Sequence, residues 1–175
     1  MFEKFGKMDL CGLNSKAEEL LNAGEIQEVR DLAAENGIAD YAEAYVDGET
    51  DYLCEDVMDA ALARIDLEAD DLGAEEIMGD WADYIRSLIV DSEEFTEKVM
   101  QPEKSFKGCV GVLAGYSITH AEPLDQDIIK AMDKAVTDAQ LKKLGLQRSY
   151  LKYTKIGMPG IATAKRLIRE YYEEV

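Results

Sequence analysis

Histidine, cysteine and proline are scarce in this 175-residue chain, which holds one, three and three of them. The cysteines are Cys11, Cys54 and Cys109, and they are odd in number, far apart and without the spacing of metal ligands. We therefore expect neither a disulfide framework nor a zinc site. Each cysteine has apolar neighbours, which predicts a small buried side chain.

Long apolar runs are also missing. No stretch approaches the roughly 18 consecutive apolar residues that a membrane-spanning helix needs. The first ten residues, MFEKFGKMDL, lack the apolar centre of a signal peptide. We therefore expect the protein in the cytoplasm.

The common motifs of catalytic and metal sites are absent. The chain has no G-x-S-x-G elbow, no G-x-x-x-x-G-K phosphate loop and no H-E-x-x-H pair. The one histidine, His120, keeps open the hypothesis of a small enzyme, but a lone histidine at a helix end is usually structural or solvent-exposed. The acidic run at 47–51 begins like a calcium loop, yet Tyr52 and Met58 stand where that loop requires glycine and glutamate. We expect no catalytic residue, metal ion or cofactor.

Basic residues are rare in the first part of the chain. Residues 1–97 contain 28 acidic and 6 basic side chains, a balance of −22, whereas residues 98–175 contain 9 acidic and 13 basic ones, a balance of +4. The net charge is −18. This asymmetry predicts an acidic lobe joined to a mildly basic one.

Apolar residues recur with the period of an α-helix through most of the chain, and no stretch alternates convincingly as a β-strand would. The clearest helix runs from Ile77 to Ile89, where one face is apolar. We also predict helices that begin near Ser15, Ile26, Asp51, Asp91, Lys104, Asp125 and Pro159. The helix after Asp125 is expected to bury Ile128, Ile129, Met132, Ala135, Val136 and Ala139. About seven helices give an all-α fold class, a compact multi-helix domain.

A carboxylate-rich segment at 66–76 is expected to be a linker or a weak helix. It marks the predicted boundary between a small acidic N-terminal helical subdomain, residues 1–71, and a helical core with a basic C-terminal stretch, residues 72–175. Farther on, Gly108, Gly111 and Gly115 recur within one predicted helix, although each costs about 1 kcal/mol relative to alanine. Either a neighbouring helix approaches closely there, or the face is a smooth groove for a partner.

A group of short motifs resembles a known family. They are the run from Asp91 to Phe95, a K-S-x-x-G-C box at 104–109, and a C-terminal G-x-P-G followed by A-K-x-x-I and a tyrosine pair. The last three elements comprise Gly157, Pro159, Gly160, Ala164, Lys165, Ile168, Tyr171 and Tyr172. Together with the run from Ile77 to Val112, they resemble the PcfK-like family of conjugative elements and phages, which overlaps a family of type II-A anti-CRISPR proteins. The resemblance covers about the last hundred residues well, and its motifs look structural rather than catalytic.

The resemblance implies a non-enzymatic protein of a bacterial host cell that binds and inhibits the type II RNA-guided DNA nuclease. Carboxylates would then mimic phosphates and occupy the basic channel that holds nucleic acid. The candidate acidic row comprises Glu55, Asp56, Asp59, Asp70, Asp71, Glu75, Glu76, Asp80 and Asp83. Alternatively, these side chains only form a solvated surface.

A basic stretch follows in the C-terminal part, and residues 139–169 contain no acidic side chain. The candidates for binding nucleic acid or a protein partner are Lys104, Lys107, Lys142, Lys143, Arg148, Lys152 and Lys155. With interleaved tyrosines, they could follow a phosphate backbone while the rings stack on bases. The alternative function is an accessory factor of a conjugative element that binds DNA or a transfer protein, and the plain alternative is a solvated face.

Overall fold

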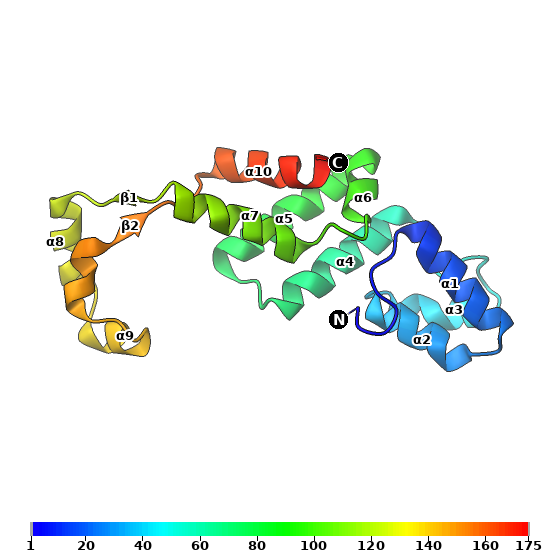
Figure 1. The fold of residues 1–175 in the computed structure, drawn as a ribbon. Helices are drawn as coiled ribbons and strands as arrows, with labels where there is room; N and C mark the ends of the chain where they lie inside the picture. The colour runs from blue at the N-terminus through cyan, green and yellow to red at the C-terminus, as the bar shows by residue number, and fades with distance from the viewer. Residues whose placement is uncertain (1, 175) are drawn as a thin grey trace.

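The computed structural model describes residues 2–174, and it is mostly helical (Figure 1), which confirms the helical fold class. One short two-stranded ribbon, which the sequence did not indicate, joins distant segments: β1 (Glu122–Pro123) pairs antiparallel with β2 (Lys155–Ile156). Strands of two residues are too short to show an alternating pattern. The α-helices are α1 (Leu10–Asn22), α2 (Ile26–Glu35), α3 (Ala42–Val46), α4 (Val57–Asp71), α5 (Glu76–Asp91), α6 (Glu93–Val99), α7 (Phe106–Thr119), α8 (Gln126–Ala135), α9 (Asp138–Lys143) and α10 (Ile161–Glu173). The 3-10 helices are η1 (Ala39–Tyr41) and η2 (Arg148–Tyr153).

Side-chain caps fix where several helices begin. Asp9 accepts a hydrogen bond from the Gly12 amide and starts α1, so the predicted start at Ser15 is wrong. Ser92 rather than Asp91 caps α6. The single helix predicted after Asp125 is two helices, since Thr137 caps α9 separately.

The body of the molecule comprises α1 to α7 and α10. One cluster of buried apolar side chains runs through it, from Leu13 in α1 to Tyr172 in α10. The segment predicted as a linker or weak helix at 66–76 is the last part of α4 up to Asp71, followed by a tight turn at Gly73. Because α4 also packs against α5, α6 and α7, the division of the chain at residue 71 stays a prediction.

Residues 121–160, which we call the arm, project from the body (Figure 1). The arm comprises β1, α8, α9, η2 and β2, and only Leu141, Leu151 and Pro159 are buried in it. None of these three belongs to the core cluster of the body. The predicted burial of the apolar face of α8 is therefore wrong, because no element of the body covers that face; Ile128 is 52% exposed.

The three glycines of α7 have different surroundings. A Cβ atom on Gly108 would lie 2.2 Å from the hydroxyl oxygen of Tyr171, so a side chain of α10 approaches it closely. Nothing lies within 4 Å of a Cβ atom on Gly111 or Gly115. The close-approach interpretation therefore holds for Gly108 alone, and the atoms that approach belong to a tyrosine ring.

The cysteines follow the prediction in two of three cases. Cys54 and Cys109 are buried, whereas Cys11 is exposed on α1. Burial raises the pKa of the Cys109 thiol to about 12, and it raises the pKa of the Cys54 thiol as well.

Thiol labelling of the native protein at about pH 8 is expected to modify Cys11 alone, because only its sulfur meets solvent and the two buried thiols stay protonated. All three should react after unfolding in denaturant, as counted by mass spectrometry. The cysteines of the unfolded chain ionise near pH 8.5, whereas the thiol of folded Cys109 has a pKa of about 12. The free energy of unfolding should therefore decrease as the pH rises from about 8.5 to about 12. Rapid native labelling of Cys109 would contradict its burial.

Candidate functional site

Two charged side chains, Arg64 and Glu68, are buried one turn apart on α4, at 2% and 3% exposure. The Arg64 Nη1 donates to the carbonyl oxygens of Met100, at 2.8 Å, and Val99, at 3.3 Å. Its Nη2 donates to the carbonyl oxygen of Met8. Burial lowers the pKa of Arg64, and the nearby Glu68 carboxylate acts in the opposite direction. The guanidinium therefore holds the chain before α1 against the end of α6.

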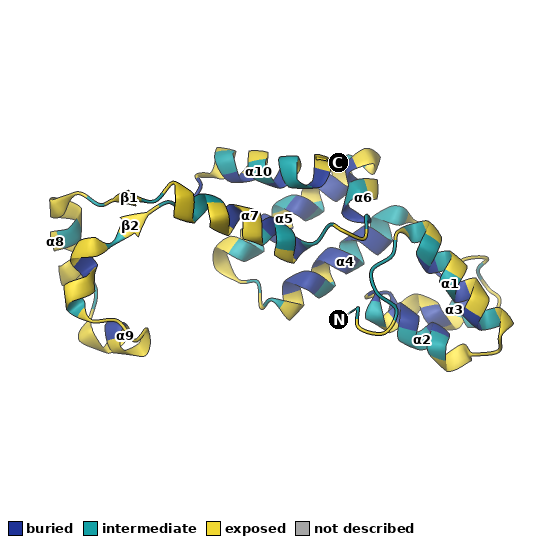
Figure 2. Cartoon of the chain, viewed as in Figure 1, coloured by how far each residue is buried: buried dark blue, intermediate teal, exposed yellow. Residues whose placement is uncertain are grey.

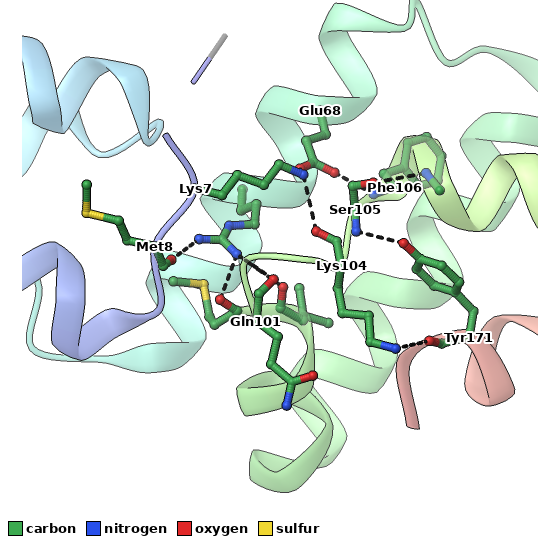
Figure 3. A network of polar contacts seen from close by, with 12 residues as sticks. Lys7, Met8, Glu68, Gln101, Lys104, Ser105, Phe106 and Tyr171 are labelled. Carbon is green, nitrogen blue, oxygen red and sulfur yellow. Dashed lines mark hydrogen bonds and ion pairs between the residues drawn. The ribbon is translucent and has the colours of Figure 1, made fainter. Parts of the chain in front are cut away.

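Glu68 completes this network on the other side (Figure 3). Its carboxylate pairs with the Lys7 ammonium and accepts a hydrogen bond from the Phe106 amide at the start of α7. Lys7 also donates to the Lys104 carbonyl oxygen at 3.2 Å. The network therefore joins four segments of the chain: the residues before α1, α4, the end of α6 and the start of α7.

Two of the motifs that carry the family resemblance, the K-S-x-x-G-C box and the tyrosine pair, meet in space beside this network. In Figure 3 the K-S-x-x-G-C box lies against Tyr171 of the tyrosine pair. The Ser105 amide donates to the Tyr171 hydroxyl at 3.0 Å, and the Lys104 ammonium donates to the Tyr171 carbonyl oxygen at 2.7 Å. Lys104 also donates to the Glu174 carbonyl oxygen at 2.6 Å, so it stabilises the end of α10. Its ammonium is therefore engaged within the fold, and its role towards a partner stays a prediction.

An acidic groove of about 1130 Å³ lies between α1, the loop before α4, and α6. The Asn14 side chain donates to the Cys54 carbonyl oxygen at 2.8 Å and accepts from the Cys54 amide at 3.0 Å, which fixes that loop against α1. No lysine, arginine or histidine lines the groove in the described part of the chain. Its seven carboxylates are Asp9, Glu18, Asp51, Glu55, Asp56, Glu93 and Glu97.

The predicted acidic row is divided by the fold. Glu55 and Asp56 line the groove at the start of α4, although Asp56 also caps that helix through the Met58 amide. Asp59 accepts a hydrogen bond from the Tyr41 hydroxyl at 3.0 Å, and Asp83 pairs with Arg86 at 2.7 Å. The remaining members lie exposed around the turn between α4 and α5: Asp70, Asp71, Glu75, Glu76 and Asp80.

Sequence reasoning missed the part of the groove that α1 and α6 supply. Glu93 and Glu97 are one helical turn apart in the sequence, and this spacing could have predicted an acidic face on α6. Their position opposite Glu18 and Glu55 depends on how the helices pack, and no local pattern gives that.

The predicted basic stretch is likewise divided. Arg148 bonds inside the arm, with Nη1 2.8 Å from Asp133 and Nη2 2.7 Å from Asp138, and these hydrogen bonds raise its pKa. Lys107 is exposed on α7, in the body. Four lysines of the predicted stretch remain exposed on the arm: Lys142, Lys143, Lys152 and Lys155.

His120 lies at the end of α7 with its ring stacked on Tyr116, the ring centroids 3.8 Å apart. Its Nδ1 is 3.0 Å from the Thr119 hydroxyl and 3.2 Å from the Tyr116 carbonyl oxygen. The ring therefore packs on its own helix, at a distance from the groove lining.

Residues 2–174 contain no cluster of three or more histidine, cysteine, aspartate or glutamate side chains arranged to hold a metal ion. Within the same residues, no helix combines the length and the apolar character required to span a bilayer.

Comparison of the chain with protein-family models, curated proteins and solved structures gives no match. The resemblance to the PcfK-like family therefore stays a prediction.

Proposed function

We propose that this chain is a non-enzymatic inhibitor that binds the type II RNA-guided DNA nuclease in a bacterial cell and blocks its engagement or cleavage of DNA. The acidic surface supports this proposal most directly. Carboxylates line the groove at the start of α4 and lie exposed around the turn between α4 and α5, and no basic side chain lines the groove in the described residues. Carboxylates spread over about 20 Å of helix can meet a channel built to hold phosphates.

The target class comes from the family resemblance, and the structure adds a role for its motifs. The K-S-x-x-G-C box and the tyrosine pair hold α7 against α10. In this proposal they maintain the fold, and the acidic residues of the groove and of the turn between α4 and α5, with the start of α5, contact the nuclease.

The test is DNA cleavage by purified nuclease with guide RNA and a target duplex, with this protein added before or after the guide. Charge reversal at Glu55, Asp70, Asp71 and Asp80 to lysine should raise the concentration for half-inhibition by more than about tenfold. These four side chains are exposed and none caps a helix, unlike Asp56. The matched control reverses Glu25, Asp40, Asp47 and Glu49, which changes the net charge equally. Unchanged inhibition by the first variant would rule out phosphate mimicry.

The alternative function, an accessory factor that binds nucleic acid through the basic stretch, is favoured by the four exposed lysines and by Tyr150 and Tyr153, which are 53% and 69% exposed. The net charge of −18 opposes it. A gel shift of bare DNA by this protein alone, lost on neutralising those lysines and weakened by salt, together with no effect on the nuclease, would favour this alternative.

A further inference from the structure

The arm exposes apolar side chains that its own fold does not cover. Of the fifteen large apolar side chains that are exposed in residues 2–174, seven belong to these 40 residues. In Figure 2 most of the arm is exposed, whereas buried residues are frequent in the body. Such a concentration marks an interaction surface rather than scattered surface residues. The seven are Ile128, Leu144, Leu146, Tyr150, Tyr153, Ile156 and Met158.

The same surface is cationic. The arm carries seven basic and five acidic side chains, a balance of +2, while the rest of the chain has a balance of −20. Arg148 is held by Asp133 and Asp138, but Lys142, Lys143 and Lys155 have no carboxylate within ion-pair distance in residues 2–174. A partner for this surface needs apolar contacts and negative charge.

The acidic groove has both properties. Its seven carboxylates surround apolar groups of Leu10, Tyr52, Val57 and Met100. Tyr52 is 56% exposed, so part of this apolar surface is open to a partner. The volume of about 1130 Å³ is at the upper limit of small-molecule sites, which suits a segment of protein.

The arm and the groove lie at opposite ends of the molecule (Figure 1): the arm extends from α7 and α10, whereas α1 and α3 lie at the other end. The arm cannot reach the groove of its own chain. We propose that the arm of one copy docks in the acidic groove of a second copy, and that two copies lying antiparallel make this contact twice.

Symmetry favours this closed arrangement. In a two-fold dimer the arm-to-groove contact occurs twice, so the buried surface area is twice that of one contact. A specific interface typically buries roughly 1,200–2,000 Å² in total. Nucleic acid is a poorer occupant of the arm, because it offers phosphates alone, whereas the groove of another copy combines seven carboxylates with the apolar groups that the exposed side chains of the arm require.

The experiment is sedimentation-velocity centrifugation of the full chain over a range of concentrations. A monomer–dimer equilibrium is expected, and its dissociation constant should rise at least about tenfold between about 0.05 M and 0.5 M salt. The double substitution Lys142→Glu and Lys143→Glu reverses two charges of the arm. It should raise the dissociation constant of the dimer by about 100-fold. Reversal of two groove charges, in Glu93→Lys with Glu97→Lys, should do the same.

Mixing the two variants is the decisive step. Both arm-to-groove contacts regain opposite charges in the mixed pair, so a heterodimer should form although each variant alone is monomeric. The matched control, Lys107→Glu with Lys165→Glu, changes the net charge as the arm variant does but lies on the body, and it should dimerise like the original chain. Cys11 lines the groove, and its labelling rate should fall on dimerisation.

A monomer at all concentrations, an open series of growing oligomers, or a dimer that survives the arm reversal would each overturn the proposal. A monomer whose arm lysines instead bind single-stranded nucleic acid would assign the arm to that ligand. Sedimentation needs no nuclease, so the dimer is measured separately from the proposed inhibition; because the arm and the nuclease would contact the same groove, the dimer must dissociate before the groove meets the nuclease.

Discussion

Replacement of Arg64 by alanine is expected to lower the free energy of unfolding by about 3–5 kcal/mol, the usual cost of removing one member of a buried charged network. The guanidinium is 2% exposed and satisfies the carbonyl oxygens of Met8 and Met100. Without it, those oxygens lose a buried donor, and Glu68 loses a compensating positive charge. Urea unfolding followed by circular dichroism measures the change.

Arg86→Ala is the matched control. Arg86 pairs with Asp66 and Asp83, each at 2.7 Å, but these partners lie on the surface, where such pairs contribute about 1 kcal/mol or less. If both arginine variants unfolded at nearly the same urea concentration, the Arg64 network would not have the structural role that we assign to it.

Gly157→Ala should release the arm from the body. A Cβ atom at this position would lie 1.9 Å from the Ser117 carbonyl oxygen and 2.7 Å from the Ala121 amide nitrogen. Both are backbone atoms where α7 leads into the arm, so the ribbon must shift as a unit. Overpacking of this kind costs about 1–3 kcal/mol, which corresponds to an increase of about 5- to 160-fold in the open population.

Limited trypsin digestion with mass spectrometry measures this opening. Cleavage after the arm lysines, for instance Lys142 and Lys155, should accelerate at least about fivefold, while the body stays intact. Gly115→Ala on the same helix is the control: nothing lies within 4 Å of its added Cβ atom, so stability should rise by up to about 1 kcal/mol. Equal digestion rates for both variants would show that a side chain fits at position 157.

The amino-acid sequence determined the helical class and the most regular helices, because apolar periodicity and capping are local properties. The apolar face between Ile77 and Ile89 lies within α5, and Asp125 caps α8 as predicted. The uneven distribution of charge is also a property of the sequence alone. By contrast, the caps at Asp9 and Ser92 were missed, since several nearby polar residues can cap a helix and packing selects among them.

Only the tertiary structure decided which charged side chains are free to contact a partner. Arg64 and Glu68 resemble ordinary helix-surface residues in the sequence, yet both are buried, and Lys104 and Arg148 bond within the fold. It also gathered the groove from three separate segments, and it placed the apolar face of α8 in an arm, where only η2 covers part of it. The physical reason is that burial and charge pairing depend on contacts between residues far apart in the chain, whereas helix periodicity depends on neighbours within one or two turns.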